Sequence, residues 1–199
     1  MARTSRWSGL SQTERRAERR RLLVRAAFEL FGEQGEAGVT VRSVCRHSEL
    51  NTRYFYESFA DTDELLEAAY DVVVADLIAA LYGAMENLPD DRARLAAGVR
   101  AVLEFSSEDA RRGKILFTEA RTNPVLSARR SMIQEELRKS VLDGDQQPSR
   151  PSRVAELTGA AMYSGAMAEL AQQWLLGNLG TDVEPVVKAV VRQWMPEGV

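Results

Sequence analysis

Apolar residues recur at intervals of three and four along most of this sequence, and no segment alternates between apolar and polar residues as a half-buried strand does. This spacing is typical of amphipathic helices, each of which must bury its apolar stripe against another helix. Glycine and proline are sparse between the stripes, so few breaks interrupt them. The pattern predicts an all-α fold without an internal repeat.

The N-terminal stripes predict four helices with recognisable starts and stops. A first helix over residues 14–34 ends at Gly35, and a short second helix follows Thr40, which is a good N-cap. After a turn at residues 48–50, Asn51 caps a third helix over residues 52–59. Asp61 or Thr62 caps a long fourth helix that reaches about residue 82. Short helices followed by a long one divide the chain into domains at residues 1–60 and 61–199.

The second domain reads as a helical bundle. Crowded helix breakers in the segment DGDQQPSRPS predict a loop at residues 143–152. Helices are expected over residues 92–106, 108–118, 124–142, 154–176 and from 183 onward.

Composition excludes several classes of protein. With 45% hydrophobic and 28% charged residues, the chain is globular and not disordered. Its single cysteine, Cys45, cannot form an intramolecular disulfide, which favours a reducing cytosol. The basic start is followed by no apolar stretch that would make a signal peptide, and the longest apolar segment, residues 72–82, is too short to span a bilayer. We therefore expect a soluble, cytoplasmic protein.

Charge is distributed unevenly along the chain. Residues 1–60 carry 11 Lys and Arg against 7 Asp and Glu, a balance of +4, whereas residues 61–199 carry 15 against 22, a balance of −7. A basic front on an acidic body suggests a polyanionic partner for the front alone, although a chance difference between the two parts explains it equally simply.

Residues 40–59 have the layout of a helix-turn-helix, in which one helix braces and the next enters the major groove of DNA. Phe55 and Phe59 lie one turn apart, so both can point inward, with Val44 and Cys45 as partners. The opposite face offers donors and small groups to phosphates and base edges. That face carries Thr52, Arg53, Tyr54, Tyr56 and Glu57.

A stretch of about fifty residues, RLLVRAAFELFGEQGEAGVTVRSVCRHSELNTRYFYESFADTDELLEAAYD, resembles the N-terminal domain of the TetR family of repressors. The segments AAFELFGEQG, TVRSV, YFYESF and DELL follow one another in register, whereas the rest of the chain shares only the family's helical layout. The resemblance implies DNA binding through a capping residue, base-reading residues and phosphate contacts. The implied residues are Thr40, Arg42, Asn51, Thr52, Arg53, Tyr54, Tyr56 and Thr62.

Several of these positions have a second interpretation. Arg53 is either a solvated residue or the donor of two hydrogen bonds to a guanine. Tyr54 either contacts a base or packs on the first helix. Glu57 either accepts from a cytosine amino group or is a solvated or salt-bridged residue, and because it repels phosphate we expect the second. Glu49 stands where the family has a turn glycine, and a different backbone conformation is expected there. The arginines at 15, 16, 19, 20 and 21 form either a solvated run or an arm on DNA.

Two C-terminal segments predict a homodimer. The helix over residues 154–176 is apolar on more than one side, and the final helix carries a complete valine stripe. We expect both to pair with their two-fold mates as a four-helix bundle, the alternative being a self-sufficient monomer core. The expected interface residues are Gly165, Ala168, Val183, Val187, Val190, Val191 and Trp194.

Aromatic and methionine side chains between the helices are candidates for a small-molecule pocket, although each is more often an ordinary core residue. No charged anchor stands out, so the expected effector is mostly apolar. A ligand that favours one tilt of the fourth helix would shift the two recognition helices, and the resemblance implies release from the operator. The candidates are Tyr82, Phe105, Phe117, Met132, Met162, Tyr163 and Met167.

The main rival is an enzyme. His47 is the only histidine, and it lies two residues from Cys45 on a helix, so the two side chains face apart. A zinc site and a di-iron carboxylate site both lack their further ligands, and no glycine-rich phosphate loop occurs. We expect no cofactor and no catalysis. A helical interaction protein that has lost DNA binding is the other alternative.

Overall fold

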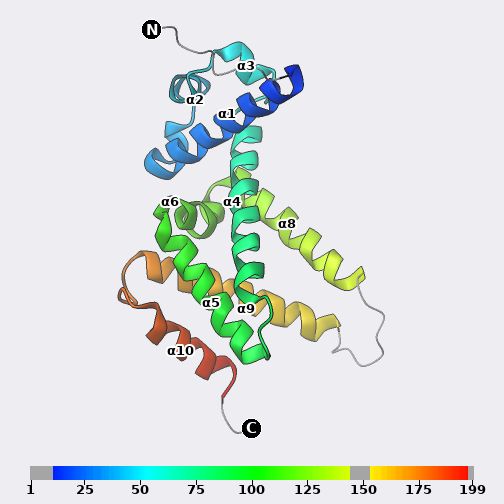
Figure 1. Ribbon diagram of the computed structural model, residues 1–199, viewed down its shortest axis with the longest axis vertical. Helices are drawn as coiled ribbons and strands as arrows, with labels where there is room; N and C mark the ends of the chain where they lie inside the picture. Colours follow the sequence, from blue (N-terminus) through cyan, green and yellow to red (C-terminus); the bar gives the residue numbers. More distant parts are fainter. Residues whose placement is uncertain (1–10, 144–152, 197–199) are drawn as a thin grey trace. The chain divides into compact units, whose positions relative to one another are not determined.

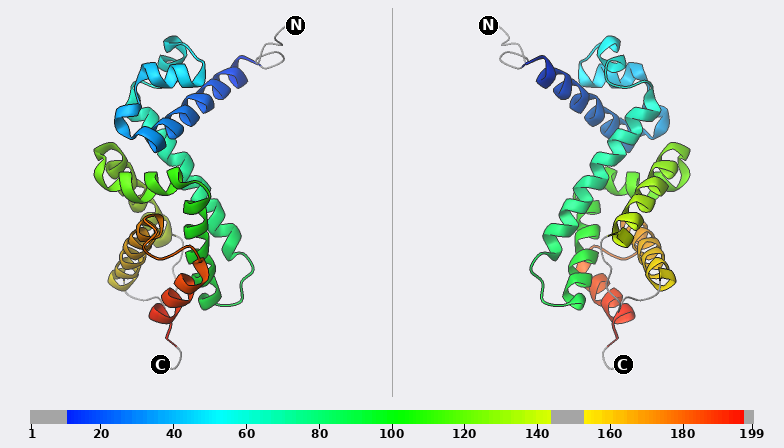
Figure 2. Two further views of the ribbon diagram at one scale, coloured as in Figure 1. Left: turned by 90° about the vertical axis from the view of Figure 1, so that its left-hand side faces the viewer. Right: turned by 90° about the vertical axis from the view of Figure 1, so that its right-hand side faces the viewer.

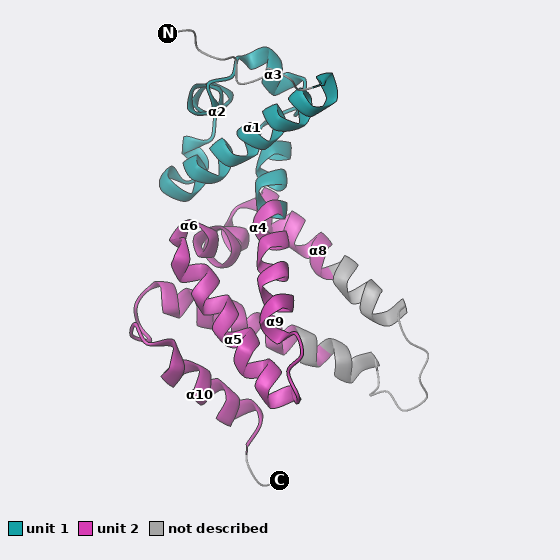
Figure 3. Ribbon diagram, viewed as in Figure 1, with its two compact units in different colours: residues 1–71 teal, residues 72–199 magenta. Residues whose placement is uncertain are grey.

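The computed structural model describes residues 11–143 and 153–196, and within these ranges the secondary structure is helical throughout. Residues 1–10, and residues 144–152 with most of the expected loop, lie outside the described residues, whereas the arginines of the expected arm fall on described residues. The chain forms two compact units, residues 1–71 and 72–199, which divide within one long helix (Figures 1 and 3). No helix in the described part of the chain combines the length and the hydropathy that crossing a membrane requires.

The first unit consists of three helices and the start of a fourth. They are α1 (Gln12–Gln34), α2 (Val41–Ser48), α3 (Thr52–Tyr56) and α4 (Thr62–Met85), with a 3-10 turn at Glu36–Gly38.

A side chain caps each of these four helices at its start. Ser11 and Thr40 form reciprocal capping boxes with Glu14 and Ser43, in which each partner satisfies a backbone N–H of the other. Asn51 Oδ1 accepts from the Tyr54 amide at 3.2 Å, as the sequence predicts. Asp61 Oδ1 accepts from the Glu64 amide at 2.9 Å, so Asp61 and not Thr62 caps α4. These caps fix where each helix begins.

The core of the first unit is aromatic and fully enclosed. Phe55 and Phe59 are 0% and 2% exposed, and their ring centroids lie 6.1 Å apart, which confirms that both point inward. Val44 and Cys45 are buried with them, and burial raises the pKa of the Cys45 thiol. The largest other members are Leu23, Phe31 and Leu65.

Helix α3 is shorter than the sequence suggests. It ends at Tyr56, and Glu57 stands at its C-terminus, although the Phe59 amide still donates to the Phe55 carbonyl at 2.9 Å. The chain must turn before α4, and Glu64 holds that turn by accepting from the Ala60 amide at 2.7 Å.

Glu49 adopts the left-handed conformation, with φ 57° and ψ 31°, immediately after α2. The expectation that this turn takes a different backbone conformation without glycine is therefore wrong. Amides of residues 49 and 50 donate to the last carbonyls of α2, at Arg46 and Cys45, and these bonds hold the turn in a conformation that glycine adopts more readily.

Within its described residues, the second unit contains the rest of α4 and six further α-helices. Two of them, α6 and α7, are single turns that flank a π-helical segment at Lys114–Glu119, labelled η2. The α-helices are α5 (Asp91–Glu108), α6 (Ala110–Gly113), α7 (Ala120–Thr122), α8 (Pro124–Asp143), α9 (Arg153–Leu175) and α10 (Val183–Trp194).

The single helix expected over residues 108–118 is thus wrong. Asp109 has an extended backbone that ends α5, and its side chain accepts from the Arg111 amide at 3.0 Å to start α6. A Cβ on Gly113 would lie 2.6 Å from Leu175 Cδ1, so the glycine lets α6 approach α9 closely. Asp109 therefore separates this segment from α5, and within it α6, η2 and α7 follow one another without a gap.

One apolar cluster forms the core of the second unit. It lies among α5, α9 and α10, and Figures 1 and 2 show α10 running beside α5. Its buried members are Val99, Val102, Leu103, Met167, Ala171, Val186, Val187 and Val191.

Candidate functional site

The exposed face of α2 and α3 carries most of the residues expected to touch DNA. Arg53 is 83% exposed in its side chain and Tyr56 is 62% exposed, directly over the buried Phe55. Tyr54 and Thr62 are half-buried. The remaining four, all exposed, are Thr40, Arg42, Asn51 and Thr52.

Glu57 connects this face to α1. Its Oε1 accepts from Arg53 Nε at 2.9 Å, and its Oε2 lies 3.6 Å from Arg19 Nη2. Its backbone carbonyl accepts from Arg16 Nη2 at 3.0 Å. Of the two roles weighed from the sequence, the structure shows the salt-bridged one.

The α1 arginines are largely engaged within the first unit. The Arg19 guanidinium lies 4.4 Å from the Tyr54 ring centroid, and that of Arg20 lies 4.7 Å from the Phe59 ring. Arg21 pairs with Glu18 at 2.6 Å, and Arg15 donates to the Ser11 carbonyl. Arg19 and Arg20 hold α1 against α3 and the turn after it through cation–π contacts, whereas the contacts of Arg15 and Arg21 stay within α1 and its N-cap. Tyr54 accordingly packs on the first helix, and its ring still borders the exposed face.

His47 takes part in an ion-pair network between α1 and α2. Its Nε2 lies 2.6 Å from Glu29 Oε2, while Arg25 Nε donates to Glu29 Oε1 at 2.9 Å. The hydrogen bonds from Arg25 and then from His47 hold the pKa of Glu29 below its ordinary value. Within the described residues no group of three or more His, Cys, Asp or Glu could hold a metal ion. His47, the single histidine of the sequence, thus links α2 to α1 through Glu29.

In the second unit the pocket candidates separate into two groups. Met167 and Phe105 are buried, and Phe117 and Tyr163 are half-buried against the apolar cluster. The Tyr163 ring packs edge-on against Trp194 with centroids 5.6 Å apart, and burial raises the pKa of the tyrosine. The other three point into solvent in the single chain: Tyr82, Met132 and Met162, at 73%, 54% and 63% exposure.

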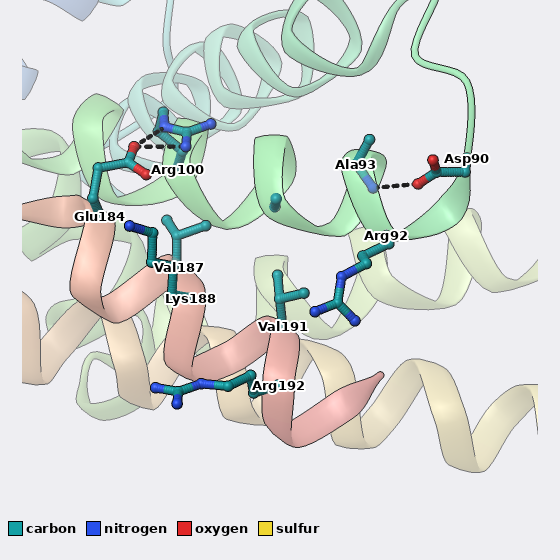
Figure 4. Close-up of a pocket in the computed structure, with 10 residues that line it drawn as sticks. Asp90, Arg92, Ala93, Arg100, Glu184, Val187, Lys188, Val191 and Arg192 are labelled. Atoms are coloured by element: carbon teal, nitrogen blue, oxygen red, sulfur yellow. Dashed lines mark hydrogen bonds and ion pairs between the residues drawn. The ribbon is translucent and has the colours of Figure 1, made fainter. Parts of the chain in front are cut away.

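A groove of about 670 Å³ lies between α5 and α10, and none of the candidates lines it. Figure 4 shows the Arg100–Glu184 ion pair at one end and Asp90 at the other, with Val187 and Val191 between them. Lys188 and Arg192 stand one turn apart along α10, and neither has an ion-pair partner in the described part of the chain. The sequence signal for this groove was two cations spaced by four on a helix with a valine stripe.

The expected dimer residues are only partly available to a partner. Val187 and Val191 are 3% and 6% exposed because α5 and α9 of the same chain cover them, and Ala168 on α9 is also buried, at 6%. The whole valine stripe was expected to pack against a second copy of the chain, and the burial of Val187 and Val191 within one chain corrects this expectation. Val183 and Val190 are half-buried on the same cluster, whereas Gly165 and Trp194 are exposed.

Comparisons with known proteins agree with this geometry. Residues 23–69 match the family model described as bacterial regulatory proteins, tetR family. The chain is 25% identical over 181 residues to the HTH-type transcriptional activator FasR of Mycolicibacterium smegmatis, which covers 89% of this chain and 81% of that protein.

Solved structures show the same fold. A TetR family transcription regulator from Marinobacter aquaeolei superposes with a TM-score of 0.62 at 18% identity, over 90% of this chain and 97% of that one. The regulator FadR from Bacillus subtilis, solved in complex with stearoyl-CoA, gives a TM-score of 0.69 at 14% identity, over 90% and 99%. With a helix-turn-helix that matches the family model and a fold shared along the length of both structures, the chain belongs to the TetR family of DNA-binding transcriptional regulators.

Proposed function

We propose that this regulator is a repressor that binds a palindromic DNA site as a homodimer and leaves it when a small, mostly apolar effector binds. The observation that carries the proposal is the two-sided helix α3. It buries Phe55 completely and presents Arg53 and Tyr56 to solvent on a surface fixed by capped helices. A helix of this kind can insert into the major groove without disturbing its own core. We assign DNA binding to residues 1–60 and effector binding with dimerisation to residues 61–199.

Enrichment of bound duplexes from a randomised pool tests DNA binding directly. We expect the purified protein to retain a two-fold symmetric sequence, and the double variant Arg53→Ala, Tyr56→Ala to lose that enrichment. Tyr82→Ala, which removes an equally exposed ring from α4, is the matched control and should enrich the same sequence. If the wild type retains no duplex at low salt, the proposal fails.

The exposed apolar side chains of α9 and its following turn support the homodimer. Met162 and Leu176 are 63% and 62% exposed, and Trp194 on α10 is 40% exposed. Monomeric proteins rarely leave such groups uncovered together, and a two-fold partner would cover them. Light scattering on a size-exclusion column should give twice the chain mass of 22.2 kDa at micromolar concentration. A monomer would contradict this part.

The effector we propose is amphipathic, with an anionic group on an apolar body. The floor of the α5–α10 groove, Val187 and Val191, belongs to the apolar cluster against which Phe117 and Tyr163 also pack. Apolar atoms could enter that cluster while Lys188 and Arg192 hold a carboxylate or phosphate at the rim. The stearoyl-CoA held by Bacillus subtilis FadR has this chemistry.

Thermal shift with stearoyl-CoA, stearate and free CoA distinguishes the parts of such a ligand. We expect stabilisation by stearoyl-CoA or stearate, and a loss of most of it in Lys188→Ala, Arg192→Ala. Arg94→Ala, a cation on α5 that does not line the groove, should leave it unchanged. Stabilisation by none of the three, or by strongly polar metabolites alone, would overturn this effector class.

The sign of regulation and the absence of catalysis complete the proposal. FasR is named an activator, so a reporter gene placed behind the enriched sequence is needed to decide for this chain. We expect lower expression with the regulator present and recovery with effector, in the cytoplasm where its DNA lies. Activation of the reporter, or steady turnover of any effector, would contradict the respective part.

A further inference from the structure

The contacts of Glu57 point to a role beyond stabilising α3. Its carboxylate contacts two arginines, one through each oxygen: Arg53, which is 83% exposed, through Oε1, and Arg19, whose side chain is 15% exposed, through Oε2. Its backbone carbonyl is held from α1 by Arg16. A carboxylate restrained on one side by the protein core can restrain a solvent-exposed side chain on the other.

The atoms that make the Arg53 contact matter. Glu57 Oε1 accepts from Nε, and no described residue occupies the two terminal amino groups, Nη1 and Nη2. Those two groups are the pair that can donate side by side to O6 and N7 of a guanine in the major groove. The guanidinium is therefore oriented through one nitrogen while its outer edge stays available.

We propose that Glu57 is the positioning residue for Arg53 and that the oriented guanidinium specifies a G·C pair in each half-site. The inference rests on the proposed DNA binding and adds the residue that sets its specificity. Holding a long side chain in one orientation reduces the conformational entropy it loses on binding a base. The carboxylate also offsets the arginine charge, which weakens its attraction to phosphates of any sequence.

The cation–π contact of Arg19 with Tyr54 supports a fixed position for Glu57. Arg19 lies over the Tyr54 ring at 4.4 Å, and its Nε is buried without a hydrogen-bond partner in the described structure. The Arg19–Glu57 ion pair, at 3.6 Å, places a carboxylate beside this mostly buried guanidinium, whose charge would otherwise be left uncompensated. Contacts with α1 thus position Glu57, and Glu57 in turn orients the exposed Arg53 side chain.

The test compares binding to two duplexes: the sequence that the wild type enriches from a randomised pool, and the same duplex with its G·C pairs scrambled. In Glu57→Gln, which keeps the size of the side chain, we expect affinity for the scrambled duplex to rise and the ratio of the two affinities to fall about tenfold. Glu49→Gln removes the same charge from the α2–α3 turn and should leave the ratio unchanged.

A second set of variants separates positioning from a general effect. In an Arg53→Ala background, Glu57→Gln should cause no further loss of the ratio, because the residue acts through Arg53. The Arg53 Nε–H should also exchange faster with solvent in Glu57→Gln without DNA, whereas circular dichroism stays unchanged. An unchanged ratio in Glu57→Gln, or an equal fall in the Arg53→Ala background, overturns the inference while the enrichment by the wild type leaves DNA binding standing. A wild type that enriches nothing overturns both.

Discussion

The two units of this regulator differ in how completely they cover their own apolar surface. In the described part of the first unit, Tyr56 is the one large hydrophobic residue left exposed, and it lies on α3, the helix proposed to enter the major groove. The second unit exposes Tyr82, Met132, Met162 and Trp194. A unit that buries its large apolar side chains can be interpreted from its own residues. A unit that leaves such side chains exposed is expected to bury them against a partner or a ligand.

The largest expected effect comes from a substitution that opens a cavity in the buried core of the first unit. Phe55→Ala removes a ring that is 0% exposed and should lower the free energy of unfolding by about 3–5 kcal/mol, because the cavity cannot be filled by the short helix that bears it. Urea denaturation followed by circular dichroism measures the loss. Tyr56→Ala is the control, expected within about 0.5 kcal/mol of the wild type in stability. Equal losses in both variants would contradict the two-sided description of α3.

The next test concerns the exposed residues of the second unit. Trp194→Asp places a charge on an exposed side chain of α10 and should weaken the proposed dimer at least about 30-fold, the size of an interface hot spot. Sedimentation equilibrium measures the dissociation constant. Tyr56→Asp, on the first unit, should leave it unchanged, and a similar weakening in both variants would place the dimer interface elsewhere.

Helix-capping side chains should contribute similarly to the free energy of unfolding in both units. Asn51→Ala and Asp182→Ala each remove an acceptor for a backbone N–H at the start of a helix, α3 or α10, and each should cost about 1 kcal/mol. Amide hydrogen exchange localises the effect to the first turn of the helix concerned. Loss of protection across the whole unit after either change would show that the helix start nucleates more than its own turn.

The smallest expected effect is a pH dependence in each unit. Hydrogen bonds from Arg25 to Glu29, and from Arg111 to Asp109, lower the pKa of each carboxyl below its ordinary value. A lowered folded pKa adds stability that is present above the ordinary value, near 4 to 4.5, and is lost as pH falls through the folded pKa.

Glu29→Gln and Asp109→Asn should therefore flatten the fall of stability with acid below about pH 4.5, each by less than about 1 kcal/mol because both side chains are partly exposed. Melting temperatures measured between pH 3 and pH 7 give the slopes. A variant that keeps the slope of the wild type would show that its carboxyl titrates alike in the folded and unfolded chain.

The sequence predicted the first unit closely because its signals are local. Thr40 and Asn51 cap the helices they were expected to cap, and Phe55 and Phe59 are buried as their spacing indicates. Glu49 was misjudged because hydrogen bonds to the end of α2 outweigh the preference of its side chain, and these bonds are invisible in a residue list. Arg53 and Glu57 are spaced by four on one helix, but Arg19 and Glu57 lie 38 positions apart, and no helical periodicity reports that contact.

The second unit was predicted only in outline. The valine stripe of α10 was visible, but whether α5 of the same chain or a partner covers Val187 depends on how helices far apart in sequence pack. The broken segment after Asp109 and the groove between α5 and α10 arise from the same distant packing. Periodicity identifies which face of a helix is apolar, and it does not identify the neighbour.

Cys45 is the single cysteine in this sequence, it is 6% exposed, and burial raises the pKa of its thiol. A thiol of this kind is protonated at neutral pH and closed to alkylating reagents. One cysteine introduced at an exposed position, such as Tyr82→Cys, would consequently accept a spin label or a fluorophore with no change to the native residue. One such probe on each copy of the chain could then report distances across the proposed dimer, with and without the proposed effector, in the otherwise unaltered protein.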